Sequence, residues 1–127
     1  MIAHAHLHVS DYQKSKAFYT KVLATLGYTN NMEVGQAAGF HDGKNTDFWV
    51  LKEDVVPTHL AFEAETKDEV HGFYQAALAE GATDNGGPGY REAYWAGYYA
   101  AFVIDPDGHN IEAAYWDYEK AGEQRPA

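Results

Sequence analysis

The chain repeats itself, and an internal repeat constrains the architecture more strongly than any single motif does. At an offset of 55 positions, residues 3–7 align with residues 58–62, and residues 17–19 align with residues 72–74. Later in each half, around two aspartate turns, the offset grows to 63. The second half therefore contains eight additional residues, which lie between positions 85 and 101.

The repeat predicts two copies of one structural unit. The units span about residues 1–53 and 56–117, and residues 119–127 read as a polar tail. A chain of 127 residues has the length of a single domain, so we expect the two units to fold together as one domain over residues 1–127.

The first strand is predicted from a simple alternation. Residues 2–9 alternate between polar and apolar side chains, which is the pattern of a half-buried strand. His4, His6 and His8 share one face of this strand, while the apolar side chains occupy the other. The repeat places His59 at the position equivalent to His4.

Both halves continue with a helix that begins in the same way. Ser10 with Gln13, and Thr66 with Glu69, have the spacing of a capping box, in which two side chains bond the free N–H groups of a helix start. Apolar residues then recur at helical spacing, and in the first half they end at Gly27. Each unit therefore enters a helix directly after its first strand.

The end of the second unit carries a turn signal. Residues 105–108, Asp-Pro-Asp-Gly, suit a type I turn between strands at 101–104 and 110–115. Residues 86–97, rich in glycine, predict a loop. We expect an α+β fold in which two tandem βαβββ units form a curved mixed sheet around a cleft.

Composition excludes several classes of function. Nineteen acidic residues against nine basic ones give a net charge of −10, which disfavours nucleic acid and membrane surfaces as partners. The absence of cysteine excludes disulfides, thiolate metal sites and a cysteine nucleophile. The sequence shows no basic leader and no long apolar run, so we expect a cytoplasmic protein that acts on a small molecule.

Three side chains are candidates for a metal site. Strand parity places His4 and His59 on equivalent faces, and it turns Glu112 of the last strand to the same open face. Two imidazoles and one carboxylate can hold a divalent ion such as Fe, Mn, Ni or Zn and leave coordination positions free. On spacing alone, the three could equally be a strand-edge histidine, a partner of a backbone carbonyl and a solvated acid.

Other residues could complete the site. His6 faces the same way as His4 and is a candidate general base. The additional residues of the second half are rich in rings, which could grip a flat or anionic substrate or form a dimer interface; they include Tyr90, Arg91, Tyr94, Trp95, Tyr98 and Tyr99. His41, His71 and His109 are expected on the surface or in turns.

Several segments resemble the vicinal oxygen chelate superfamily, which includes glyoxalase I, extradiol dioxygenases, fosfomycin-inactivating thiol transferases and bleomycin resistance proteins. The resemblance rests on the opening His-x-x-Leu-x-Val-Ser-Asp at 4–11, the Ser-Lys-Ala-Phe-Tyr segment at 15–19, the strand at 58–62 and the closing segment at 102–112. It covers nearly the whole chain and implies the paired βαβββ fold of that family. It also implies a homodimer, often with both chains building each cleft.

The resemblance implies metal ligands at four positions, which here are His4, Trp49, His59 and Glu112. Tryptophan cannot bind a metal ion, so the glyoxalase I reaction, which uses a glutamate at that position, is disfavoured. We expect Trp49 to fill the vacated space as part of the substrate wall. The three remaining ligands match the pattern of the dioxygenases and thiol transferases.

The sequence therefore predicts a divalent-metal-dependent enzyme of lyase, dioxygenase or transferase type that acts on a small oxygen-bearing molecule. The main alternative is a non-catalytic protein that sequesters a drug or metabolite, as bleomycin resistance proteins do. A metal-free structural or regulatory relative is a third interpretation.

Overall fold

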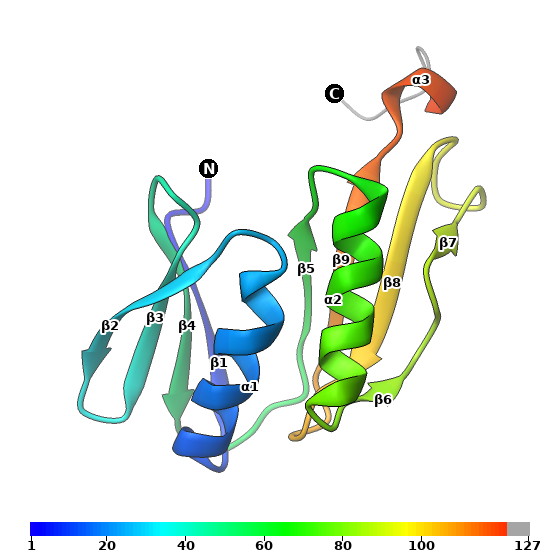
Figure 1. Ribbon diagram of the computed structural model, residues 1–127. Coiled ribbons are helices and arrows are strands. Elements are labelled where there is room, and N and C mark those ends of the chain that lie inside the picture. Colours follow the sequence, from blue (N-terminus) through cyan, green and yellow to red (C-terminus); the bar gives the residue numbers. More distant parts are fainter. Residues whose placement is uncertain (122–127) are drawn as a thin grey trace.

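The computed structural model describes residues 1–121, so residues 122–127 of the predicted polar tail lie outside the described part of the chain. Each unit has one long helix and a set of strands (Figure 1). The first unit comprises β1 (Ala5–Val9), α1 (Tyr12–Ala24), β2 (Thr29–Val34), β3 (Ala37–His41) and β4 (Thr46–Lys52). The second comprises β5 (His59–Glu63), α2 (Lys67–Ala79), β6 (Thr83–Asp84), β7 (Gly89–Tyr90), β8 (Tyr98–Ile104) and β9 (Asn110–Trp116), and α3 (Tyr118–Ala121) follows.

The strands confirm the predicted repeat and form two sheets of matching order. The first sheet runs β1-β4-β3-β2, and the second runs β5-β9-β8-β6, with β7 also pairing with β8. In each sheet the first strand of the unit is parallel to the last, and the other pairs are antiparallel. The strand that corresponds to β2 is broken into β6 and β7, because the additional residues of the second half interrupt it.

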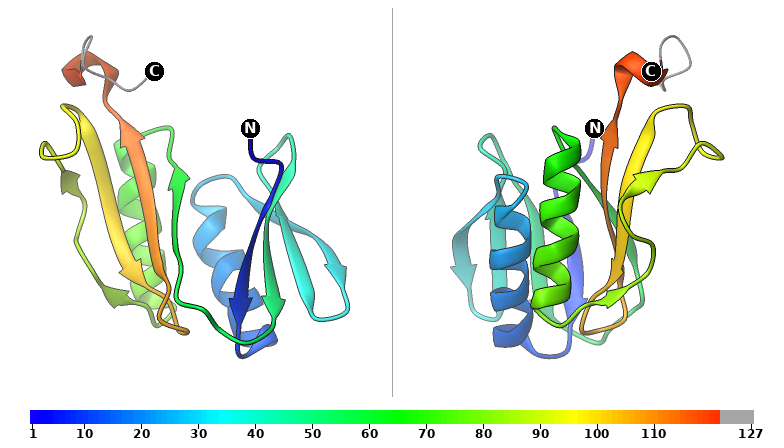
Figure 2. Two further views of the ribbon diagram at one scale, coloured as in Figure 1. Left: turned by 180° about the vertical axis from the view of Figure 1, so that it is seen from behind. Right: turned by 45° about the vertical axis from the view of Figure 1, so that its right-hand side comes forward.

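The two sheets stand with β1 and β5 as their inner edges, and α1 and α2 cover the same side of both (Figures 1 and 2). Within residues 1–121, no helix is long and apolar enough to cross a membrane. The side of each sheet away from the helices is left uncovered, and on it lie several of the side chains that the sequence singled out, among them His6 and Glu112.

The helix starts show one confirmed cap and one that is wrong by a residue. Thr66 caps α2 as predicted, accepting a hydrogen bond from the backbone N–H of Glu69. At α1 the cap is Asp11, whose carboxylate accepts from the backbone N–H of Lys14. Ser10 is not available as a cap because its hydroxyl donates to the Asp107 carboxylate, 2.5 Å away.

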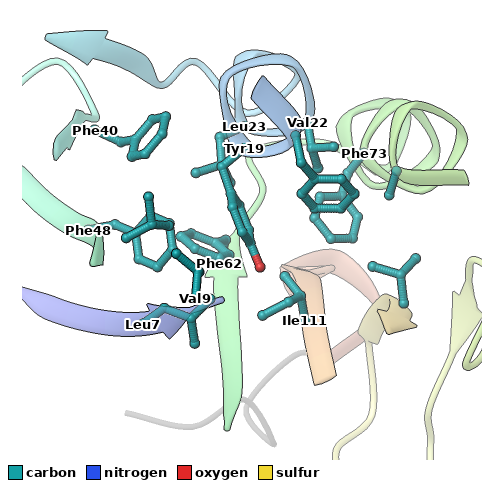
Figure 3. Packing of buried hydrophobic residues seen from close by; sticks show 14 of the residues in the cluster. Leu7, Val9, Tyr19, Val22, Leu23, Phe40, Phe48, Phe62, Phe73 and Ile111 are labelled. Atoms are coloured by element: carbon teal, nitrogen blue, oxygen red, sulfur yellow. The ribbon is translucent and has the colours of Figure 1, made fainter. Parts of the chain in front are cut away.

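One hydrophobic cluster joins the two units (Figure 3), and a smaller one lies within the second unit. The ring of Phe48, from β4, packs edge-to-face against the ring of Phe62, from β5, with 5.0 Å between centroids. Tyr19 of α1 packs against the same Phe48 ring, with centroids 5.3 Å apart. Burial of apolar surface across this boundary stabilises both units together.

The turn after β8 connects the units through polar contacts. The buried Asp105 accepts hydrogen bonds from the backbone N–H groups of Asp107 and His109, and from the hydroxyl of Tyr19 at 2.5 Å. Burial and the Asp105 carboxylate raise the pKa of Tyr19 well above its ordinary value, so the hydroxyl keeps its proton and remains a donor.

His109, which the sequence predicts on the surface or in a turn, lies in this turn but is not at the surface. It is fully buried, and its Nδ1 accepts from the backbone N–H of Thr58 at 3.1 Å. Its Nε2 donates to the carbonyl oxygen of His8, 2.7 Å away in β1. The imidazole therefore bridges the backbones of the two units, which no local sequence pattern reveals.

Replacing Tyr19 with Phe should lower the free energy of unfolding by about 1–3 kcal/mol, because the buried Asp105 carboxylate loses a hydrogen-bond donor. Urea unfolding followed by circular dichroism measures this change. Tyr74→Phe is the matched control, since it removes a hydroxyl that donates to Asp84 at an exposed site, where a change within about 0.5 kcal/mol is typical. Equal unfolding midpoints for the two variants would contradict the assigned role of the Tyr19 contact.

Candidate functional site

The uncovered faces of the two sheets carry most of the predicted site residues. On the first face, His6 of β1 is paired in register with Trp49 of β4. On the second face, Glu112 of β9 lies between Ala61 of β5 and Phe102 of β8. Alternation along the strands turns these side chains away from the helices, as predicted from parity.

His59 and Glu112 form the polar centre of the second face. The Nε2 atom of His59 lies 3.0 Å from the Oε1 atom of Glu112. The other ring nitrogen of His59, Nδ1, lies 2.9 Å from the carbonyl oxygen of Asn110 and donates to it, which fixes the orientation of the ring. The Glu112 side chain is only 4% exposed, whereas that of His59 is 49% exposed.

Tyr98 completes the surroundings of Glu112. Its hydroxyl donates to the Oε2 atom of Glu112. Burial and the Glu112 carboxylate raise the pKa of Tyr98 well above its ordinary value, so the hydroxyl stays protonated. Sequence reasoning counted Tyr98 only among the rings of the insertion. Its parity with Phe102 indicates the correct face. The strand register, however, pairs Tyr98 with Trp116 and Glu112 with Phe102, so the hydroxyl meets Glu112 only through the reach of the side chains along the sheet.

The first face is aromatic rather than acidic. The ring of His4 stacks on that of His6, with centroids 5.1 Å apart, and the His6 ring lies 6.3 Å from Trp49. The indole crosses over Gly39 of β3, where an added Cβ would stand 3.0 Å from two indole carbons. Glycine at position 39 therefore makes the space that Trp49 occupies.

The structure brings His59 together with Glu112, but His4 does not join them within one chain. Among residues 1–121, no three His, Cys, Asp or Glu side chains are grouped closely enough to hold a metal ion. Figure 1 explains the separation, because β1 and β5 run in opposite directions. His4 directly precedes β1, and His59 is the first residue of β5. These two repeat-equivalent histidines therefore lie at opposite ends of the two neighbouring edge strands.

Two residues of the insertion, Arg91 and Tyr94, contact rings of the second face. The Arg91 guanidinium lies 5.4 Å from the centroid of the Phe102 ring and donates to the carbonyl oxygens of Gly87 and Gly89. Tyr94 is exposed and packs edge-on against Tyr98, and Trp95 is exposed as well. These groups are available to a ligand that reaches His59.

Tyr90 and Tyr99 lie on the opposite, helix-covered side. Tyr99 is buried, and its hydroxyl oxygen lies 2.6 Å from the Nε2 atom of His71 on α2. The Tyr90 hydroxyl donates to Asp117, and the Lys120 ammonium lies 3.8 Å from the centre of the Tyr90 ring. These two tyrosines therefore hold α2 and α3 against the sheet, and the structure does not bring them to His59 and Glu112.

A hollow of about 520 Å³ lies between the units, and Ala61 and Glu63, which share the face of β5 with His59, are part of its lining. Tyr28, Asp47, Phe62 and Glu63 are among the residues that line it, and none of the predicted site residues does. The Tyr28 hydroxyl donates to Asp47, and burial raises the pKa of that aspartate. Neither His59 nor Glu112 is part of its lining.

Comparisons with known proteins agree with this architecture. A model of the glyoxalase/bleomycin resistance protein/dioxygenase superfamily matches residues 1–113. The chain is similar to a glyoxalase/bleomycin resistance protein from Albidiferax ferrireducens T118, with a TM-score of 0.81, 26% identity and coverage of 89% of this chain and 97% of that chain. A search of curated proteins found no match.

Two further solved structures, each below 25% identity, show the fold alone. One is a glyoxalase/bleomycin resistance protein/dioxygenase family enzyme from Burkholderia phytofirmans PsJN, with a TM-score of 0.70, 18% identity and coverage of 91% of this chain and 98% of that chain. The other is a lactoylglutathione lyase from Agrobacterium tumefaciens, with a TM-score of 0.68, 17% identity and coverage of 91% of this chain and 92% of that chain.

Replacing Gly39 with Ala should displace the Trp49 indole and destabilise the protein by about 1–3 kcal/mol, because the added methyl group overlaps packed atoms. Urea unfolding and acrylamide quenching of tryptophan fluorescence measure the two effects. Gly72→Ala in α2 is the control, since its Cβ would meet nothing closer than Thr25 at 3.7 Å. Unchanged stability and unchanged quenching in Gly39→Ala would refute the close packing of Trp49 against β3.

Proposed function

Because the chain belongs to the glyoxalase/bleomycin resistance protein/dioxygenase superfamily, we propose that it binds a divalent metal ion and acts on a small molecule with two neighbouring oxygen atoms. The observation that carries the proposal is the approach of the His59 Nε2 atom to the Glu112 Oε1 atom, at 3.0 Å. Both atoms belong to groups that ligate metal ions, and they converge on one point.

The hydrogen bond at the far side of the His59 ring sharpens this argument. Since Nδ1 donates to the Asn110 carbonyl, a neutral His59 directs the lone pair of Nε2 at the carboxylate. Two electron-rich atoms at that distance repel each other unless a proton or a metal ion lies near both. A carbonyl that orients a histidine in this way is a common outer partner of metal-binding histidines. The donor set therefore fits a divalent ion.

We propose that the third ligand, His4, comes from a second chain in a homodimer. Within one chain His4 and His59 lie at opposite ends of β1 and β5, so rotation of a second copy is needed to bring the first face of one chain over the second face of the other. The resemblance to a family whose clefts are often built by two chains supports this arrangement. Trp49 of the first face would then form an apolar wall opposite Glu112.

In such a cleft the metal ion, the residues of the insertion and His6 would have different roles. A divalent ion supplies Lewis acidity, which polarises oxygen atoms of the substrate. Arg91 and Tyr94 contact rings of the second face, and together with the exposed Trp95 they orient the substrate by charge and by ring contact. His6, stacked beside His4, holds or moves a proton, because imidazole is the side chain that ordinarily titrates nearest neutral pH.

A second candidate function is sequestration of a ligand without chemistry. It is favoured by the stacked His4 and His6 rings beside Trp49, a surface that can hold a flat molecule without any metal. The net charge of −10 would suit a cationic ligand. Tight binding of a cationic aromatic drug to metal-free protein, with no binding of Zn(II), would favour this candidate over the enzyme.

The metal site predicts that His4→Ala and His59→Ala each lose tight binding of Zn(II) or Co(II), because each removes one of three ligands. Calorimetry on demetallated protein measures the loss. His41→Ala is the control, since His41 accepts a hydrogen bond from Gly43 in a turn remote from the site. Unchanged metal affinity in His59→Ala would refute the assignment.

Mixing the two inactive variants tests whether the site spans two chains. In a heterodimer of His4→Ala with His59→Ala, one composite site carries both substitutions and the other is intact. Random re-pairing makes about half of the dimers heterodimers, so an equimolar mixture should regain about a quarter of the wild-type metal capacity. A site within one chain would stay broken in every chain. Light scattering should give twice the chain mass of 14.1 kDa, and a monomer would exclude the composite site.

The chemistry should not be that of glyoxalase I, because Trp49 occupies the position of the second carboxylate. We expect little isomerisation of the methylglyoxal–glutathione hemithioacetal with Ni(II) or Zn(II), and clear binding of catechol or acetohydroxamate to the Co(II)-loaded protein. An ultraviolet assay of thioester formation and the visible Co(II) spectrum measure these. Glyoxalase turnover on the order of 10 per second, a usual enzyme rate, would show that one carboxylate suffices.

A further inference from the structure

Glu112 has two carboxylate oxygens, and each faces a different neighbour. Oε1 lies 3.0 Å from the His59 Nε2 atom, whereas Oε2 accepts the hydrogen bond from the Tyr98 hydroxyl. The carboxylate is almost completely buried, so solvent has little access to either oxygen. A buried carboxylate whose oxygens are bound to different groups has a fixed orientation.

We propose that Tyr98 is a positioning residue that makes Glu112 offer a single oxygen, Oε1, to the metal ion. The inference rests on the proposed metal-binding function and adds a determinant of its coordination geometry. A carboxylate binds a metal ion through one oxygen or through both. Because Oε2 already accepts the Tyr98 hydrogen bond, the first mode is favoured, and one coordination position is kept for an oxygen of the substrate.

Tyr98 is itself held in place. Its ring packs edge-on against Trp116, with centroids 4.5 Å apart, and against Tyr94, with centroids 5.5 Å apart. Its backbone is paired in register with that of Trp116 on β9. The hydroxyl therefore reaches Glu112 from a strand and a ring cluster, which are rigid supports for such a contact.

Through its hydrogen bond to Tyr98, Glu112 is linked to the turn that precedes β8. The turn at 91–97 leads directly into Tyr98, and the backbone N–H of Tyr98 donates to the Trp95 carbonyl oxygen at 3.1 Å. Movement of this turn would therefore shift Tyr98 and change its hydrogen bond to Oε2 of Glu112. The rings of the insertion thus act on the metal ligand as well as on the ligand-accessible surface.

The test compares Tyr98→Phe with Tyr99→Phe. Tyr98 and Tyr99 are neighbours in β8, and each variant removes one hydroxyl. The Tyr98 hydroxyl contacts Glu112, whereas the Tyr99 hydroxyl contacts His71 on the helix-covered side. In Tyr98→Phe, Oε2 is released and can join the metal ion, which raises its coordination number. We expect the visible absorption of bound Co(II) to weaken in Tyr98→Phe, because this absorption falls as the coordination number rises.

Acetohydroxamate, which needs two free coordination positions, provides the second readout. Its affinity for the Co(II)-loaded Tyr98→Phe protein should fall by about 10-fold or more, the range in which changes to outer partners of metal ligands act. Tyr99→Phe should match the wild-type spectrum and affinity. Circular dichroism of both variants checks that each is folded, which the isosteric loss of one oxygen should permit.

The outcomes separate the inference from the proposed function. If wild-type protein binds no Co(II), the proposed function is wrong and the inference falls with it. If wild-type protein binds Co(II), and Tyr98→Phe has the wild-type spectrum and hydroxamate affinity, the inference alone is overturned. An equal change in Tyr98→Phe and Tyr99→Phe would also overturn it, since a general loosening of β8 would then explain both.

Discussion

The arrangement of the two units depends on one turn, residues 105–109, whose side chains point across the boundary. Asp105 accepts from Tyr19 of α1, and Asp107 accepts from Ser10 at the end of β1. His109 bridges backbone groups from both units. The contacts of Asp105 and His109 are buried or partly buried, that of Asp107 is exposed, and all of them are directional. They therefore specify an orientation where apolar packing alone would permit sliding. The position of β1 relative to β5 follows from this turn, and with it the position of every candidate ligand.

Because of this orientation, residues at equivalent positions of the two units lie far apart in the chain's structure. The two units repeat the same topology, but β1 and β5 run in opposite directions along their shared boundary (Figure 1). Residues that occupy equivalent positions, such as His4 and His59, therefore lie at opposite ends. Within residues 1–121 the equivalent residues do not meet in one chain, and in the proposed homodimer a second copy would supply the missing half. The homodimer is for this reason part of the proposed function rather than an addition to it.

The two uncovered faces have diverged in chemistry while keeping the same backbone plan. At equivalent strand positions, one unit has Trp49 packed over Gly39, and the other has Glu112 held by Tyr98. The first change removes a charge and creates an apolar wall. The second keeps a carboxylate buried without leaving its oxygens unpaired, which would cost about 1–3 kcal/mol for each group. The aromatic residues of the insertion, Tyr94 above all, support the second arrangement.

Local patterns were enough to predict the repeated units, the Thr66 cap, the turn at 105–108 and the shared face of His59 and Glu112, because each depends on periodicity or on neighbours a few residues away. The burial of His109 depends on the packing of one unit against the other. The hydrogen bond of Tyr98 to Glu112 and the helix-covered position of Tyr99 depend on how side chains and α2 pack on the sheet of the second unit. The separation of His4 from His59 depends on the rotation between the units. Sequence periodicity determines which face of a strand a side chain occupies, but only tertiary packing decides what stands opposite that face.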